Sequence, residues 1–190
     1  LNGNEELDTR LGRVLADIGS YYRADRTYLF CIREDRQALD NTHEWCAAGI
    51  APQIDILQGV DIRYMDRWNP VFQRKEAVVE PDIEHIRAAY PDEYRIMTVQ
   101  GIHSYMEAPL FADGKLSGFL GIDNPDAAMI GNSSAPILTM GYAISNTLVR
   151  DAAQKRERER YERSLREMTA SVPGSVGALR VNLTKGTCAA

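Results

Sequence analysis

The chain has 190 residues, a length that suggests one domain of ordinary size with a short appendage. Hydrophobic residues make up 44% and charged residues 26%, a composition that is typical of a globular protein and excludes a disordered one. The net charge is -5, so a surface built to bind nucleic acid, which needs a basic patch, is not expected.

The compartment can also be inferred from the sequence. No run of 18 apolar residues is present, and the first residues, LNGNEELDTR, lack the basic and apolar regions of a signal peptide, so no membrane segment is predicted. The cysteines are few and odd in number, which favours a reducing, cytoplasmic setting: Cys31, Cys46 and Cys188. The chain starts without Met, so we expect it to be a piece of a longer protein.

Hydrophobic periodicity predicts a helix over residues 5–22 and then a strand. The helix carries one apolar stripe with the spacing i, i+4, i+7, i+8 and i+11, made of Leu7, Leu11, Val14, Leu15 and Ile18. In the strand, Leu29 and Cys31 alternate with Tyr28, Phe30 and Ile32. Because both faces of this strand are apolar, we expect it inside the sheet.

A second strand is predicted over residues 38–47, after a turn at residues 34–37. Strict alternation gives it one mostly polar face and one apolar face, the latter made of Leu39, His43, Trp45 and Ala47. A turn centred near Arg36 would pair Cys46 with Arg26 and Cys31 with Asn41, which separates the sulfurs by about 16 Å along the strands. A disulfide needs Cα atoms within about 7 Å, so no bridge is expected.

The rest of the chain predicts an irregular middle, a second hairpin and a long helix. Residues 49–75 are irregular, apart from a short helix at about 65–75. A short strand ended by Pro81 and two helical turns broken at Pro91 follow. The second hairpin has the Asp-Gly pair of a tight turn in ADGK, and one helix runs from Ala135 to about Ala170. This order predicts an α+β fold with an antiparallel sheet and helices on one side.

Four segments together resemble a GAF domain over roughly residues 5–150. They are ADRTYLF, NTHEWCAAGIAPQIDILQ, VQGIHSYMEAPLF and GKLSGFLGIDNP. The resemblance implies a GAF/PAS-like antiparallel sheet of five or six strands, with the N- and C-terminal helices packed on one face and a small-molecule pocket on the other. It also implies a multidomain bacterial signal-transduction protein of the GGDEF/EAL or histidine-kinase type, with a GGDEF diguanylate cyclase as the output domain expected first.

The C-terminal segment LREMTASVPGSVGALRVNLTKGTC is similar to the helix and first strand that open a PAS domain. The alternative is a disordered tail over residues 171–190. Between this segment and the GAF-like part lies a charged helix, residues 151–170. Acid-then-base pairs at i, i+4 support an exposed helix there, namely Asp151–Lys155, Glu159–Arg163 and Glu162–Arg166.

The charged helix has two interpretations. Apolar residues at positions 161, 165, 168 and 172 follow the 4-3-4 spacing of a coiled-coil seam, although the seam is polar further back. The helix is either a solvated single helix or half of a parallel homodimer that passes a signal to the covalently linked output domain. We favour the dimer and assign to its helix Leu148, Tyr161, Leu165 and Met168.

The pocket implied by the resemblance would be lined by aromatic residues with a few polar groups at its mouth. The candidates are Tyr28, Phe30, Trp45, Asp55, Trp68, Phe72 and Tyr105, with Gln58 and Asp66 as further polar groups. For each aromatic residue a plain core role is favoured over ligand contact, because a strand needs an apolar face merely to fold.

No catalytic residue, metal site or cofactor is indicated. His43, His85 and His103 lack the spacing of a zinc site, and a haem ligand would fall to His103 alone. No carboxylate pair is legible among Glu44, Asp55, Asp61, Asp66, Glu80, Asp82, Glu107 and Asp123. The segment NPVFQRKEAVVEPDIE lacks the spacing of cyclic-nucleotide GAF domains, and the strand glycines Gly118 and Gly121 are expected to allow close helix packing.

Three functions remain open. The favoured one is a non-enzymatic sensory module that binds an unidentified small molecule or partner. The second is a catalytic GAF domain similar to methionine-sulfoxide reductases, which the missing cysteine cluster argues against. The third is a degenerate GAF domain that only dimerises.

Overall fold

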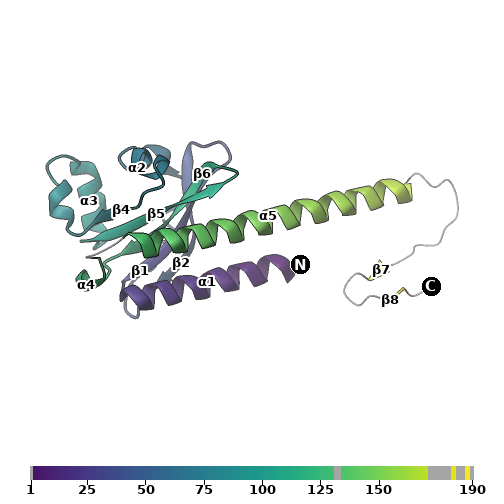
Figure 1. Cartoon of the computed structure of the whole chain (residues 1–190), viewed down its shortest axis with the longest axis horizontal. Helices are drawn as coiled ribbons and strands as arrows, with labels where there is room; N and C mark the ends of the chain where they lie inside the picture. The colour runs from purple at the N-terminus through teal and green to yellow at the C-terminus, as the bar shows by residue number, and fades with distance from the viewer. Residues whose placement is uncertain (1, 131–133, 171–180, 183–186, 189–190) are drawn as a thin grey trace. The chain divides into compact units, whose positions relative to one another are not determined.

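The computed structural model of the chain describes residues 2–130, 134–170, 181–182 and 187–188. The chain divides into two compact units, Leu1–Asp151 and Ala152–Ala190. The first unit holds a six-stranded antiparallel sheet in the order β3-β2-β1-β6-β5-β4 (Figure 1). The predicted α+β class with five or six antiparallel strands is therefore confirmed.

The elements follow the predicted order. The strands of the sheet are β1 (Arg26–Ile32), β2 (Ala38–Cys46), β3 (Val60–Asp61), β4 (Val78–Glu80), β5 (Tyr105–Ala112) and β6 (Lys115–Asp123). The helices are α1 (Asn2–Tyr22), α2 (Asn69–Gln73), α3 (Pro91–Val99), α4 (Ala127–Ile130) and α5 (Ala135–Ala170), with 3-10 turns η1 (Ile62–Met65) and η2 (Ile83–Ile86). The sequence analysis does not predict β3 or α4.

Strand β1 lies inside the sheet, as its apolar composition predicts. β1 pairs with β2 on one side and β6 on the other, as expected for a strand with two apolar faces. The second hairpin turns at Asp113 and Gly114, whose φ angles of 51° and 75° are both left-handed. This is the backbone that a two-residue Asp-Gly hairpin turn requires.

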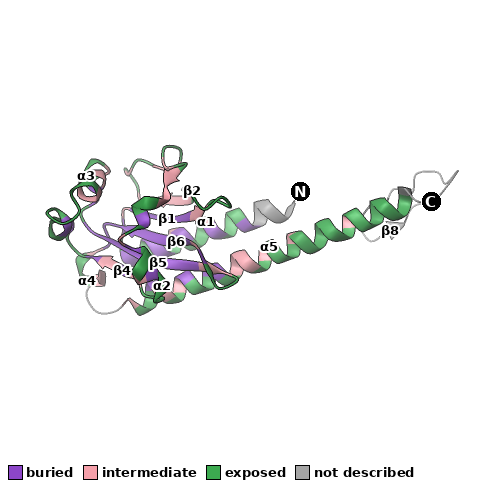
Figure 2. Cartoon of the chain, turned by 90° about the horizontal axis from the view of Figure 1, so that it is seen from above, coloured by how far each residue is buried: buried purple, intermediate pink, exposed green. Residues whose placement is uncertain are grey.

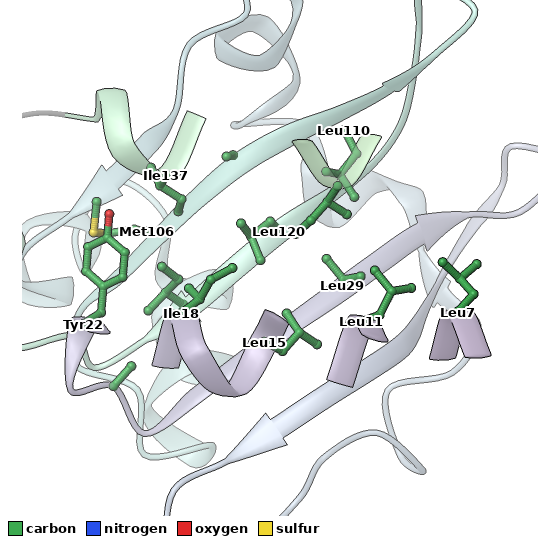
Figure 3. Close-up of a cluster of buried hydrophobic side chains, with 14 residues drawn as sticks. Leu7, Leu11, Leu15, Ile18, Tyr22, Leu29, Met106, Leu110, Leu120 and Ile137 are labelled. Carbon is green, nitrogen blue, oxygen red and sulfur yellow. The ribbon is translucent and has the colours of Figure 1, made fainter. Parts of the chain in front are cut away.

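One face of the sheet, called the helix face, packs against α1 and the first turns of α5. Figure 3 shows side chains of α1 directed toward the strands, and the same core holds Leu29, Leu110 and Leu120 of the strands and Ile137 of α5. The buried hydrophobic residues of α1, over its described positions 7–22, are Leu7, Leu11, Leu15, Ile18 and Tyr22. Val14 belongs to the predicted stripe but is 39% exposed, because it lies at the stripe's edge in a surface groove beside α5 residues.

The opposite face, called the pocket face, is covered by the segment between β2 and β5. Its core is aromatic: the rings of Phe30 and Phe119 stack at a centroid distance of 5.0 Å, and Trp68 meets Phe119 at 5.6 Å. In Figure 2 the central strands are coloured as buried. The sheet thus separates two independent cores, one on each face.

A β-bulge divides β2 into two parts. The register with β1 shifts between Leu29 and Phe30, which leaves Thr42 as the extra residue of β2. Consequently Leu39 lies on the pocket face, whereas Trp45 lies on the helix face. The prediction that Leu39 and Trp45 share one face is wrong, because strict alternation assumes an unbroken ladder.

The strand glycines Gly118 and Gly121 lie against the backbone and a side chain of the neighbouring strand β1, and not against a helix. A Cβ at Gly121 would overlap the ring of Tyr28, and a Cβ at Gly118 would overlap the backbone of β1. Their predicted role in helix packing is therefore wrong. That role belongs to Gly19 of α1, where a Cβ would meet the ring of Trp45.

The long helix α5 has the predicted bounds, and its four assigned residues fall into two groups. Leu148 is partly buried and packs on the helix-face core. The other three are exposed, by 61%, 38% and 63% respectively: Tyr161, Leu165 and Met168. Glu162 lies 3.9 Å from Arg166, as predicted, and 3.1 Å from Arg158.

The predicted PAS-like start lies mostly outside the described residues and stays a prediction. Of this segment the structure gives two short antiparallel strands, β7 (Val181–Asn182) and β8 (Thr187–Cys188). No helix within the described residues has both the length and the apolar character needed to cross a membrane.

Candidate functional site

A cavity of about 380 Å³ lies between the pocket face and the segments that cover it. Strands β1, β2, β5 and β6 form its floor, and the loop after β2, the η1 region and α3 form its cover. Much of its wall is apolar or aromatic: Tyr28, Phe30, Leu39, Trp68, Met97 and Phe119. This size falls in the range of about 300–1,000 Å³ that is usual for small-molecule sites.

Three of the predicted pocket residues line this cavity: Tyr28, Phe30 and Trp68. Phe72 and Tyr105 are fully buried in the core beside it, but neither lines it. Asp55 is exposed on the covering loop and lies outside the lining. Trp45 is on the other face of the sheet, because of the bulge at Thr42.

The polar groups proposed for the mouth have other positions. The side-chain amide of Gln58 donates to the carbonyl oxygens of Asn41 at 2.7 Å and Ile54 at 2.6 Å, so it fixes the loop backbone. Asp66 lines a separate surface hollow next to α3. Neither residue lines the cavity.

A buried charged group that the sequence analysis did not identify lies on the cavity floor. Arg26 Nε donates to Asp123 Oδ2 at 2.9 Å, and the Tyr28 hydroxyl donates to Asp123 Oδ1 at 2.8 Å. Burial raises the pKa of Asp123 to about 6, although Arg26 and Tyr28 both act to lower it. Burial, together with the neighbouring Asp123, also raises the pKa of Tyr28 well above its ordinary value.

Glu107 is the second carboxyl group of the floor, and it has no cationic partner at hydrogen-bond distance among the described residues. Its side chain is 1% exposed, and its Oε2 atom has no hydrogen-bond partner among the described protein atoms. Burial, with smaller contributions from Asp123 and Glu93, raises the pKa of Glu107 well above its ordinary range. The environment of Glu107 therefore favours the uncharged carboxylic acid, which can both donate and accept a hydrogen bond.

Charged side chains of the floor also hold the cover in place. Arg26 Nη2 donates to the carbonyl oxygen of Gln100, just after α3, at 2.8 Å. Glu44 Oε2 accepts from the backbone N–H groups of Gln53 at 2.8 Å and Ile54 at 3.0 Å. The cavity floor and the position of its cover are thus coupled through two side chains, Arg26 and Glu44.

A second network closes one end of the cover. Arg67, between η1 and α2, donates to both carboxylate oxygens of Glu93 in α3, at 2.9 and 2.7 Å. The Tyr105 hydroxyl donates to Glu93 at 2.7 Å and also accepts from Arg67. Tyr105, predicted as a pocket residue, therefore joins α3 to β5.

A signal for the missed floor residues is present in the sequence. Glu107 stands in YMEAPLF, where both neighbouring pairs are buried, and Arg26 and Asp123 stand at the ends of two central strands. A charged residue within a strand whose neighbours are all buried is expected to be buried as well. Burial of a charge is costly, so such a residue needs a partner or a function. The pairing of these three residues across strands was beyond sequence reasoning, because it depends on register.

Neither Cys31 nor Cys46 lines the cavity. Cys46 pairs with Arg26 as predicted, whereas Cys31 pairs with Asp40 instead of Asn41 because of the bulge. Both are free and only partly buried. Burial raises the pKa of both, that of Cys46 to about 11, so neither is a reactive thiolate at neutral pH.

The described residues contain no group of three or more His, Cys, Asp or Glu side chains that could hold a metal ion. His103 is exposed and does not line the cavity. Haem ligation by His103 within this cavity therefore finds no support in the geometry.

Comparison with known proteins agrees with this fold. The family model of the GAF domain matches residues 6–135, so the chain belongs to the GAF family. No curated protein matches the chain.

Solved structures with the same fold include sensory domains of bacteria. The GAF3 domain of Slr1393 from Synechocystis, in its photoproduct state, has 18% identity and a TM-score of 0.61, covering 81% of this chain and 98% of its own. The PixJ GAF domain of Thermosynechococcus elongatus, in a blue-light-absorbing form, has 13% identity, a TM-score of 0.63 and coverages of 86% and 96%. A domain assigned to a two-component sensor histidine kinase of Sinorhizobium meliloti has 17% identity, a TM-score of 0.57 and coverages of 81% and 96%. At these identities the likeness concerns the fold.

Proposed function

We propose that this GAF domain is a non-catalytic sensory module that binds a small molecule in the cavity of the pocket face. The observation that carries the proposal is the cavity itself, which combines an apolar wall with a few buried, convergent polar groups. The fold shared with domains from a sensor histidine kinase and from light-responsive proteins supports a signalling role.

Binding would be communicated through the cover of the cavity. A ligand on the floor would contact Arg26 and Glu44. These side chains form hydrogen bonds from the floor to the end of α3 and to the loop after β2. A ligand changes a conformational equilibrium only through contacts that differ between the two states. These two side chains are the contacts that a ligand could alter.

The output is proposed to be a covalently linked domain, with a GGDEF diguanylate cyclase expected first and a histidine kinase second. We propose that α5 pairs with its copy in a parallel homodimer and carries the signal. The exposed apolar residues at the 4-3 spacing support this, namely Tyr161, Leu165 and Met168. In sedimentation at high micromolar concentration we expect a dimer that Leu165→Ala weakens and Glu167→Ala, two residues along, leaves intact. A monomer throughout would refute the pairing.

The cavity is tested with a variant that fills it. Ile96 of α3 lines the cavity, whereas Val99 on the same helix is 84% exposed. Ile96→Trp should abolish the thermal shift given by any metabolite that stabilises the native chain, and Val99→Trp should leave it unchanged. By linkage, a ligand at 100 times its Kd adds about 2.7 kcal/mol. If no metabolite from a broad panel shifts the melting temperature, the degenerate, dimer-only alternative is favoured.

The catalytic alternative, reduction of methionine sulfoxide, finds no support in the site. Within the described part of the chain, neither Cys31 nor Cys46 lines the cavity, and both thiol pKa values are raised. Turnover of free methionine sulfoxide with thioredoxin would overturn the non-catalytic proposal.

A further inference from the structure

Two residues that line the cavity each carry one buried polar atom that lacks a hydrogen-bond partner among the described protein atoms. The atoms are Nε1 of Trp68, a residue of the cover, and Oε2 of Glu107, a residue of the floor. The two residues are only 5% and 1% exposed. A buried polar group without a partner costs about 1–3 kcal/mol, so few are retained without a reason.

The two groups define what a ligand must offer. Trp68 Nε1–H can only donate, so it requires an acceptor such as a carbonyl oxygen or a ring nitrogen. The acid of Glu107 can meet either a donor or an acceptor. Other lining residues are aromatic: Tyr28, Phe30 and Phe119 form one cluster of ring contacts with Trp68.

The charges around the cavity select against anions. Four carboxyl residues line it, Glu44, Asp61, Glu107 and Asp123, whereas Arg26 is the one cationic side chain among the described lining residues. Arg26 already donates to Asp123, to Gln100 and to the carbonyl of residue 51. The one cationic side chain of the described lining is therefore already paired with a carboxylate, and an anionic ligand would add negative charge to a wall that carries four carboxyl groups.

We propose that the cavity binds a small, uncharged, planar heterocyclic molecule whose acceptor meets Trp68 Nε1 and whose second polar group meets the acid of Glu107. This inference rests on the proposed function, namely that the cavity holds a small molecule, and adds the chemical class of that molecule. Lactam and heteroaromatic amide groups carry the required acceptor and donor side by side.

Four bicyclic probes of similar shape separate the requirements. Quinolin-2-one is a neutral lactam with an acceptor and a donor, its N-methyl derivative lacks the donor, naphthalene lacks both, and 2-naphthoate is an anion. Affinity can be read from Trp68 fluorescence in the Trp45→Phe variant, because the chain has two tryptophans and Trp45 lies on the other face. We expect quinolin-2-one to bind at least several-fold more tightly than naphthalene, and 2-naphthoate to bind most weakly.

Substitutions then assign the contacts. Trp68→Phe keeps a ring and removes the N–H, so the affinity for quinolin-2-one should fall by roughly 2- to 10-fold while that for naphthalene stays within about 2-fold. These affinities are measured by calorimetry, with Trp45→Phe as the matched control that changes neither. Glu107→Gln, which keeps an uncharged donor and acceptor, should retain binding, and Glu107→Leu should lose the preference for the lactam.

The outcomes distinguish this inference from the proposal beneath it. If 2-naphthoate binds as tightly as the lactam and Ile96→Trp blocks it, the cavity is a ligand site and the uncharged class is wrong. If Trp68→Phe weakens naphthalene and quinolin-2-one equally, the indole N–H is not a ligand contact and the inference fails. If none of the four probes binds while another small molecule does, the class is again wrong. If no small molecule binds at all, both the inference and the proposed function fail.

Discussion

The two faces of the sheet differ in what they bury. The helix face buries apolar side chains of α1, α5 and the strands, and the residues of its core are packed together. The pocket face buries Arg26, Glu107 and Asp123 beside aromatic rings and keeps a cavity of about 380 Å³. Hydrophobic packing suffices to fold the first face, whereas the second maintains groups whose burial opposes folding unless they are paired. Both faces bury a hydrophobic core, but only the pocket face combines its core with a cavity and buried charged groups.

The sharpest test of this difference concerns the buried ion pair. Arg26→Met should destabilise the fold by about 3–5 kcal/mol, because Asp123 would remain as a buried charge without its cation. The chain offers a matched control three residues earlier, Arg23, which pairs with Asp126 at 3.3 Å but is 78% exposed. Arg23→Met should cost about 0–1 kcal/mol. Urea denaturation of the two variants measures both values, and similar losses would show that burial is not what gives the Arg26 pair its weight.

A second test compares one residue type on the two faces. Leu120 on the helix face is 0% exposed, and Leu39 on the pocket face is 2% exposed and lines the cavity. Leu120→Ala should cost about 2–5 kcal/mol, because the packed core cannot collapse into the space. Leu39→Ala should cost less, because part of the Leu39 side chain already faces the cavity and fewer contacts are lost. Equal losses in chemical denaturation would contradict the view that only the pocket face is loosely packed.

The sequence predicts the helix face much better than it predicts the pocket face. Periodicity finds α1, both hairpins and α5, because repeating apolar positions are what the helix face requires. Periodicity puts Trp45 on the wrong face of the sheet. The bulge at Thr42 depends on how β2 aligns with β1, and it cannot be recognised from the alternation of apolar and polar residues in β2.

The site could be predicted only in part, for a similar reason. The aromatic wall was predicted at Tyr28, Phe30 and Trp68, since aromatic residues on a buried strand or loop face a core in any arrangement. The pairing of Arg26 with Asp123 joins residues 97 positions apart and follows from the register of β1 with β6. Such a contact is a property of the assembled sheet.

The remaining prediction concerns Glu107 and the pH dependence of stability. In the folded chain the pKa of Glu107 is raised well above its ordinary value, whereas in the unfolded chain it is the ordinary one, about 4.3. Above that pH the native state binds a proton that the unfolded state lacks, so stability falls as the pH rises, by about 1.4 kcal/mol per pH unit while Glu107 stays protonated. The raised pKa of Asp123, about 6, acts in the same direction but mainly below pH 6.

The window from pH 6 to 8 therefore isolates Glu107. The groups with lowered pKa values, Asp40, Asp61 and Glu84, are ionised in both states there. The raised tyrosine and cysteine pKa values act at higher pH. Glu107→Gln should reduce the loss of unfolding free energy across this window by up to about 1.4 kcal/mol per pH unit, whereas Glu76→Gln, at an exposed carboxylate, should leave the slope unchanged. A wild-type slope that survives Glu107→Gln would mean that Glu107 is charged in the folded protein, and the pocket face would then bury a second anion.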